Sequence, residues 1–166
     1  MKAFLLLVSI ISSMNSAVCD FVEKSKLGGE VYTEKGIFYF EKGKGLRWDY
    51  HSPERKTFWL LGEKIIEIYP EENLIREYKS PRSFWKIIED PSELYQIAEK
   101  IVEKKGEIFV KIKGGEEVVI HIREHRIQRV DFEDTSFEFQ KCRYNIKQPS
   151  SLWKVPATFV YGSRKK

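Results

Sequence analysis

The sequence contains few of the motifs on which enzymes and metalloproteins are built. It has no glycine-rich phosphate loop, no G-x-S-x-G motif and no C-x-x-C motif. His121 and His125 have a spacing that suits a metal only on a helix, whereas here they fall at a strand end and a turn. Paired carboxylates such as Glu71-Glu72 lie at predicted turns, where we interpret them as solvated charges. We therefore expect no enzyme activity, no catalytic residue, no metal and no cofactor.

A strong excess of charge of one sign is also missing. The 166 residues carry a formal net charge of +4, and the charged residues of both signs are interspersed. This pattern lacks the basic patch that nucleic-acid-binding proteins need. Hydrophobic residues make up 42% of the chain, which is enough for one packed core. No linker or internal repeat divides the sequence, so we expect a monomeric single domain with no nucleic-acid partner.

The chain lacks a hydrophobic run of membrane-spanning length at its N-terminus. The run Ala3–Ile11 is too short, since a spanning helix needs about 20 apolar residues. A lysine precedes the run and small, polar residues follow it, which is typical of a secretory signal peptide cleaved after Ala17 or Cys19. We interpret residues 1–19 as the signal peptide and residues 20–166 as the mature domain. The alternative is that the run forms a buried first helix or strand of the fold.

Cysteine is scarce, with Cys19 and Cys142 too few for a disulfide framework. If Cys19 leaves with the signal peptide, Cys142 has no partner in the chain, and we expect a buried thiol. In a second interpretation, Cys19 is the lipidated N-terminus of a membrane-anchored protein. Lipoprotein signals usually have a small residue directly before the cysteine and a leucine three residues before it, and Val18 and Ser16 depart from that pattern.

Residues 36–78 alternate between apolar and polar side chains as the strands of an antiparallel sheet do. Leu46, Trp48 and Tyr50 fall on one face, with charged residues between them. Gly62-Glu63 is the signal for a two-residue hairpin turn. Further strands are expected at residues 31–40, 108–112, 118–122, 127–132, 137–144 and 157–161.

The central segment, residues 80–105, has a helical period instead. Ser80-Pro81 begins a short helix with an apolar face, and residues 90–93 resemble a capping box that starts a second helix. In the second helix, apolar residues from Leu94 to Val102 recur at i, i+3, i+4, i+7 and i+8, which predicts an amphipathic helix ending at Gly106. We expect a mainly β (α+β) fold: nine to eleven antiparallel strands in a strongly curved sheet or incomplete barrel, with helices on the concave face.

The order of several residues resembles the outer-membrane lipoprotein carrier family, LolA. The motif consists of a strand, a basic turn, R-W-x-Y, then P, G, and a Y-P pair, and it spans about 35 residues. In this chain the matching residues are Gly36–Phe40, Leu46–Tyr50, Pro53, Gly62 and Tyr69-Pro70. The resemblance implies a half-barrel whose helices cover an apolar cavity. It also implies a periplasmic protein that shields the acyl chains of lipoproteins, receives them from an inner-membrane release complex and passes them to an outer-membrane acceptor.

Combined with strand parity, the resemblance selects candidates for acyl-chain contact. The sheet residues are Leu46, Trp48, Tyr50, Trp59 and Leu61, and the helix residues are Phe84, Ile88, Leu94, Ile97 and Ile101. Trp59 and Leu61 share one face, but residues 58–61 are continuously apolar, so parity leaves open which face that is. The alternative is that these apolar side chains form an ordinary core, because aromatic residues also favour strands and fill cores.

Two features of the family are altered in this chain. The family normally has a helix between the signal and the first strand, and here the signal-like segment lies where that helix belongs. The lid latch of the family is usually an arginine in the first turn, and Lys42, which lacks the planar fork of arginine, is the candidate here. Two other functions remain open: a lipid-anchored acceptor of the same fold, and an envelope sensor domain that regulates a partner.

Overall fold

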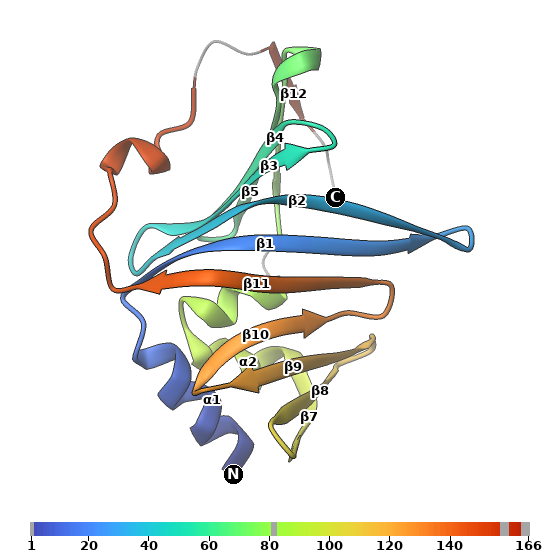
Figure 1. Cartoon of the computed structure of the whole chain (residues 1–166), viewed down its shortest axis with the longest axis vertical. Helices are drawn as coiled ribbons and strands as arrows, with labels where there is room; N and C mark the ends of the chain where they lie inside the picture. Colours follow the sequence, from blue (N-terminus) through green and yellow to red (C-terminus); the bar gives the residue numbers. More distant parts are fainter. Residues whose placement is uncertain (1, 81–82, 157–159, 164–166) are drawn as a thin grey trace.

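The computed structural model describes residues 2–80, 83–156 and 160–163. Twelve strands form one sheet in the order β12-β6-β5-β4-β3-β2-β1-β11-β10-β9-β8-β7. The strands are β1 (Ser16–Leu27), β2 (Glu30–Glu41), β3 (Gly45–Ser52), β4 (Lys56–Leu61), β5 (Lys64–Tyr69), β6 (Leu74–Lys79), β7 (Ala98–Lys104), β8 (Glu107–Ile112), β9 (Glu117–Arg123), β10 (Arg126–Asp131), β11 (Thr135–Tyr144) and β12 (Val160–Ser163). Figure 1 shows that the sheet bends from β1 and β2 towards both edges, which confirms the predicted curved sheet or incomplete barrel.

The strands pair as antiparallel neighbours, with β12 as the exception in the described part of the chain. β1 and β11 are distant in sequence, and they pair near the middle of the sheet with Phe21 opposite Phe139. β12 runs parallel to β6. Of the strand predicted at residues 157–161, the first three residues lie outside the described residues. Ser163, expected in a frayed tail, belongs to β12, and the rest of that tail also lies outside the described residues.

Four helical segments lie against the concave side of the sheet. They are α1 (Lys2–Ser12), η2 (Phe84–Ile88), η3 (Pro91–Glu93) and α2 (Leu94–Ile97). Figure 1 places α1 and α2 beside β7–β11, and the contacts of α1 with β7 and η3 agree. The short helix predicted to begin at Ser80-Pro81 is present as η2, which begins later, at Phe84, and buries Phe84, Ile87 and Ile88. Pro81 lies outside the described residues. Two further short segments, η1 (Pro70–Glu72) and η4 (Ser150–Trp153), connect strands.

The predicted amphipathic helix from Leu94 to Val102 is wrong beyond its first turn. The helix ends at Ile97, and the chain continues as β7, where Ile101 pairs with Val110 of β8. The spacing of the apolar residues is compatible with a helix and with a strand. In the strand that forms, Ile101 lies on the concave face and the charged residues are exposed. β-branched residues favour a strand when a partner strand is available, and β8 provides one.

The N-terminal apolar run forms α1 and is part of the core of the uncleaved chain. Leu7 and Ile10 are fully buried, whereas Leu5 is 64% exposed, so the helix is amphipathic. A buried first helix is the alternative to a signal peptide for this run. It also corresponds to the helix before the first strand that the LolA resemblance implies. Removal of residues 1–19 as a signal peptide concerns processing and stays a prediction. No helix in the described ranges is long and apolar enough to cross a membrane.

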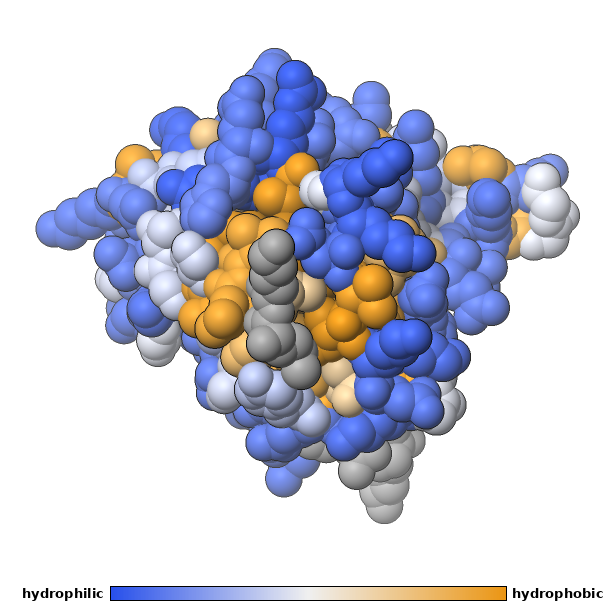
Figure 2. Space-filling model, turned by 90° about the horizontal axis from the view of Figure 1, so that it is seen from below, coloured by the Kyte–Doolittle hydropathy of each residue, from blue (hydrophilic) through white to orange (hydrophobic). Residues whose placement is uncertain are grey.

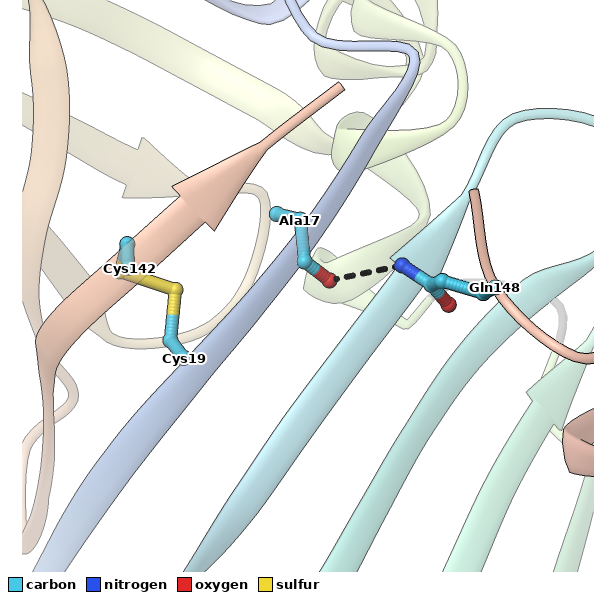
Figure 3. The surroundings of a disulfide bond; sticks show 4 residues. All are labelled: Ala17, Cys19, Cys142 and Gln148. Carbon is cyan, nitrogen blue, oxygen red and sulfur yellow. Dashed lines mark hydrogen bonds between the residues drawn. A yellow bond between two sulfur atoms is a disulfide. The ribbon is translucent and has the colours of Figure 1, made fainter. Parts of the chain in front are cut away.

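Cys19 and Cys142 form a disulfide between β1 and β11, so the expectation of a buried free thiol at Cys142 is wrong for the uncleaved chain. The two strands are neighbours in the sheet, which brings together cysteines 123 residues apart. Figure 3 shows the disulfide on one side of β1 and Gln148 on the other, where its side-chain amide donates a hydrogen bond to the carbonyl oxygen of Ala17. The same amide donates to the carbonyl oxygen of Phe40. The segment after β11 thereby holds the start of β1 against β2.

A second apolar layer covers part of the convex face. Trp59, Ile66, Ile68 and Ile75 are buried there, and Trp153 and Val155 pack against them. The indole N–H of Trp59 donates to the carbonyl oxygen of Leu152 at 2.8 Å. The chain around η4 therefore shields the outer side of β4–β6, and the two faces of this part of the sheet are both apolar.

Candidate functional site

An aromatic cluster occupies the concave face where β1, β2, β3 and β11 meet η2. The ring of Trp85 in η2 lies 5.4 Å from Trp48 and 5.1 Å from Phe137, measured between centroids. Phe38 lies 5.3 Å from Trp48 and 5.1 Å from Phe139. Tilted and edge-on contacts of this kind stabilise aromatic pairs beyond simple burial. Trp85 therefore links the sheet by aromatic contacts to η2, which together with α1, η3 and α2 forms the helical cover.

A cavity of about 230 Å³, partly open to solvent, lies beside Trp85. It is located between η2 and the concave face of β1 and β3–β6. Its apolar lining residues are Trp48, Phe58, Trp59, Leu60, Ile65, Trp85 and Phe137. A smaller apolar cavity of about 30 Å³ also touches Trp85, together with Met14, Phe40, Ile88 and Tyr144 among others. Rotation of one indole side chain would change both spaces.

The larger cavity has a polar end made by carboxylates and tyrosines. The hydroxyl of Tyr50 donates to Glu23, and the hydroxyls of Tyr69 and Tyr78 donate to Glu67 at 2.9 and 2.6 Å. Glu67 is 7% exposed although it is a glutamate on a β-strand. A buried carboxylate is tolerated when it accepts hydrogen bonds, and these tyrosines provide them.

The electrostatics of this end follow from burial. Burial raises the pKa of the Glu23 carboxyl. The hydrogen bond from Tyr50 lowers this pKa in part, and the nearby charge of Glu34 raises it further. Burial also raises the pKa of the Tyr50 hydroxyl, which stays protonated as a donor. The ammonium of Lys56 lies 4.7 Å from the ring centroid of Tyr50 and 2.7 Å from a carboxylate oxygen of Glu34. The Tyr50 ring, which lines the cavity, is therefore in cation–π contact with Lys56.

Most of the predicted ligand-contact residues are brought together on the concave side. Leu46, Trp48, Tyr50, Phe84, Ile88, Leu94 and Ile97 belong to one buried cluster, and Ile101 packs against it. Trp48 and Tyr50 line the larger cavity, and Ile88 lines the smaller one. The others are packed against neighbouring side chains. Contact of these residues with a ligand stays a prediction.

Trp59 and Leu61 do not belong to this buried cluster, because their side chains pack in the convex layer. Trp59 is nevertheless one of the residues that line the larger cavity. In the register of β3 and β4, Phe58 faces Trp48 and Leu60 faces Leu46, so these two residues occupy the concave positions instead. Residues 58–61 are continuously apolar because both faces of β4 are covered. Alternation therefore carries no information about which face each residue occupies.

Sequence reasoning missed Trp85, Phe58 and Glu67. An α-helical period places Phe84, Ile87 and Ile88 on one face and leaves Trp85 outside it. η2 is a 3₁₀-helix, in which residues three apart align, so Trp85 and Ile88 share a side. Glu67 offered a usable signal, since it interrupts the apolar run of β5 at the parity of Ile65.

The predicted latch residue, Lys42, lies in the turn between β2 and β3. Its side chain is exposed, and its backbone N–H donates to the carbonyl oxygen of Asn15, next to α1. The cover is also held at η2, where the ammonium of Lys86 lies 3.8 Å from carboxylate oxygens of Glu63 and Glu93. A latching role for Lys42 stays a prediction.

His121 has carboxylate neighbours and no histidine partner. Its ring nitrogens lie 3.0 Å from Glu107 and 2.7 Å from Asp131, and the guanidinium of Arg129 is 3.1 Å away. His125 is hydrogen-bonded to Ser9 at 3.2 Å. Within residues 2–80, 83–156 and 160–163, no group of three or more His, Cys, Asp or Glu residues is arranged to hold a metal ion.

Apolar side chains also reach the surface near the helical cover. Figure 2 shows apolar residues gathered on the face seen from below in Figure 1, where the N-terminal end of α1 lies. Leu5 and Tyr95 are exposed large apolar residues of α1 and α2, and the ring of Phe4 contacts Tyr95 at 4.2 Å. The cover therefore presents apolar side chains to solvent as well as to the core.

The architecture, a curved open sheet with helical segments on its concave side, is similar to that of a LolA superfamily protein and of other solved structures. No protein-family model matches the sequence. No curated protein matches it either. The likeness is one of structure, and it is found at low sequence identity.

Three solved structures illustrate the likeness. A LolA superfamily protein, NE2245 from Nitrosomonas europaea, superimposes with a TM-score of 0.54 at 7% identity, covering 92% of this chain and 97% of that one. An uncharacterized conserved protein from Thermus thermophilus gives 0.63 at 11% identity, covering 99% and 100%. The Pseudomonas aeruginosa MucA/MucB complex gives 0.55 at 11% identity, covering 96% of this chain and 63% of that one. At these identities the comparisons show the fold alone.

Proposed function

We propose that the protein is a periplasmic carrier that binds the acyl chains of lipoproteins and passes them towards the outer membrane. The observation that carries this proposal is the aromatic cavity between the sheet and the short helical cover. Apolar pockets at the mouths of barrels are a recurrent location for small ligands. The LolA-like fold and the motif around Trp48 support the same class of ligand.

The energetics of the site suit a carrier. Burial of each methylene group stabilises a bound chain by about 0.8 kcal/mol, so a long acyl chain needs an apolar cover in water. The cover must also open for release. Its ion pairs through Lys86 are long and partly exposed, and such pairs contribute little stability. Because the cover fills the concave face when no ligand is bound, the net affinity is the difference between two burials, which keeps binding reversible.

The proposed partners are acylated lipoproteins, an inner-membrane release complex and an outer-membrane acceptor. They are supported by the family resemblance together with the shared fold. We propose a monomer that works without a cofactor and without catalysis. Cargo release would then require an acceptor that binds the acyl chains more tightly.

Two rival functions differ in what they demand of the chain. A lipid-anchored acceptor would carry its lipid on the sulfur of Cys19, and a sulfur in the disulfide with Cys142 cannot also form that thioether. This favours the unanchored carrier. An envelope sensor domain would bind a regulatory partner instead of cargo; MucB, in its complex with MucA, has the same fold. A test for bound lipid separates the carrier from a sensor that binds none.

The test uses the full chain purified from its native envelope, with extraction and mass spectrometry of any bound lipid. Binding of a palmitoylated lipopeptide is then followed through tryptophan fluorescence, because Trp48 and Trp85 line the cavity. Trp85→Ser removes part of the apolar wall and should weaken lipopeptide binding about tenfold or more. Trp48→Glu should abolish it, although Trp48 is more deeply buried and its variant also tests the core.

Trp153→Ser is the matched control, since Trp153 packs on the convex layer. It should leave lipopeptide affinity unchanged while causing a comparable loss of packing. A folded wild-type protein that carries no lipid and does not bind the lipopeptide would contradict the proposal.

A further inference from the structure

The polar end of the larger cavity has a defined hydrogen-bonding character. Tyr50 uses its single hydroxyl proton on Glu23, and Tyr78 uses its proton on Glu67. A tyrosine that has donated its proton can still accept, and an ionised carboxylate can do nothing else. These four side chains all line the cavity, so this end presents acceptors to whatever enters.

One donor of a cavity-lining side chain has no partner among the described residues. Trp48 lines the cavity and is 6% exposed, and its indole N–H has no hydrogen-bond acceptor among the described residues. Buried N–H groups are almost always paired, so the missing acceptor indicates a group that the protein itself does not provide. The nitrogen is covered by neighbouring atoms, so an oxygen atom on a bound molecule would satisfy it once the indole turns towards the cavity.

The charges at this end disfavour anions. Glu67 is buried and Glu23 is half-buried, and like charges repel more strongly where water is partly excluded. Two cations of the described residues lie near this end and already have partners: Lys56 lies over the Tyr50 ring and pairs with Glu34, and the guanidinium of Arg76 lies 5.3 Å from the ring centroid of Tyr69. A carboxylate or phosphate head would therefore meet two acidic groups and would have to compete with these partners for a cation.

We infer that the cavity selects amphiphiles whose head donates hydrogen bonds and carries no negative charge. The apolar wall from Phe58 to Phe137 takes the chain, Glu23 and Glu67 accept from hydroxyl or ammonium groups of the head, and Trp48 donates to a head oxygen where there is one. The volume of about 230 Å³ exceeds the roughly 150 Å³ cavity that suffices for benzene, so a medium alkyl segment fits. This inference rests on the proposed function and specifies its ligand.

The experiment compares three ten-carbon probes with the full chain by calorimetry and tryptophan fluorescence, below their micelle concentrations. 1-Monodecanoylglycerol offers hydroxyl donors, decylamine offers an ammonium group, and decanoate offers an anion. A hydrogen bond to a charged acceptor distinguishes ligands by about tenfold or more, so both donor probes should bind at least that much more tightly than decanoate. Tighter binding of either donor probe identifies whether the hydroxyl or the ammonium group is preferred.

Glu67→Gln and Glu23→Gln separately test the source of the selectivity. Each replaces an acidic acceptor by an amide of the same size, which should bring the affinities for decylamine and decanoate closer together. Glu30→Gln, at the exposed tip of the β1–β2 hairpin, should leave the ratio unchanged. Two variants are used so that loss of folding in one leaves the other informative.

The outcomes distinguish this inference from the proposed function. Equal or tighter binding of decanoate would overturn the inference and leave acyl binding in place. An unchanged probe ratio in both folded variants would overturn the role of the carboxylates. Failure of all three probes and of the palmitoylated lipopeptide to bind the folded protein would overturn the proposed function, and the inference with it.

Discussion

At the scale of single residues, Gly36 in β2 illustrates how closely the strands approach behind the aromatic cluster. A Cβ atom added there would lie 2.0 Å from the carbonyl oxygen of Asp49 and 2.9 Å from the ring of Phe21. Since the first obstacle is backbone, Gly36→Ala requires β2 and β3 to separate. We expect the free energy of unfolding, measured with urea, to fall by about 2–3 kcal/mol.

Gly115→Ala is the control for this substitution. Its added Cβ would meet Ile112 at 3.6 Å, an ordinary contact. This variant should stay within about 0.5 kcal/mol of the wild type. If both variants unfold at the same urea concentration, the close approach of β2 to β3 is wrong.

A second residue-scale prediction concerns the pH dependence of stability. Burial raises the pKa of Glu23 above 4.5, the ordinary value for a glutamate. The native state then binds the proton of the Glu23 carboxyl more tightly than the unfolded chain does. The resulting stability is fully present below the unfolded pKa and is lost as the pH rises through the folded pKa.

Glu23→Gln should remove this loss, because an amide stays neutral and can still accept from Tyr50. We expect the variant to be more stable than the wild type at pH 7 to 8, and the difference to shrink towards pH 4. Urea unfolding across this range measures it. A difference that does not change with pH would mean that Glu23 does not titrate in the range proposed.

At the scale of elements, the sequence predicted strands well and helices poorly. Strands such as β3 alternate clearly because one face is wet, so parity assigns Trp48 and Tyr50 correctly. β4 is covered on both sides, so parity fails for Trp59. β7 has apolar spacing that suits a helix as well as a strand, and the choice depends on pairing with β8, which lies outside the local sequence. Long-range partners therefore decided the misses at β4 and β7, whereas Trp85 was missed because of the local 3₁₀ geometry of η2.

The helix α1 gives the element-scale prediction. Leu7 is fully buried against the concave core, whereas Leu5, two residues earlier, is 64% exposed. Leu7→Ala in the uncleaved chain should lower the free energy of unfolding by about 2–5 kcal/mol, as core truncations of leucine do. Leu5→Ala should have little effect. Equal effects of the two substitutions would mean that α1 does not pack as described.

At the scale of the whole molecule, the disulfide joins the N-terminal segment to the body of the sheet. Cys19 and Cys142 close a loop of 123 residues, and cross-links over long loops restrict the unfolded chain most. Cys142→Ser should therefore lower the free energy of unfolding by about 2–4 kcal/mol, with wild type in reductant behaving alike. Reductant should have no further effect on the stability of the Cys142→Ser variant. If reductant destabilises the variant as much as the wild type, the disulfide does not account for the loss of stability.

The same bond makes processing measurable. Cleavage after Ala17 leaves Cys19 in the mature chain, where β1 keeps it opposite β11, whereas cleavage after Cys19 leaves Cys142 unpaired. Because α1 would be absent in both products, the concave face would be more open to cargo than in the uncleaved chain. We expect the intact mass of protein from the native envelope to correspond to a start at Val18, with no titratable thiol before reduction. A start at Asp20 with one free thiol would instead show that the mature carrier works without the cross-link.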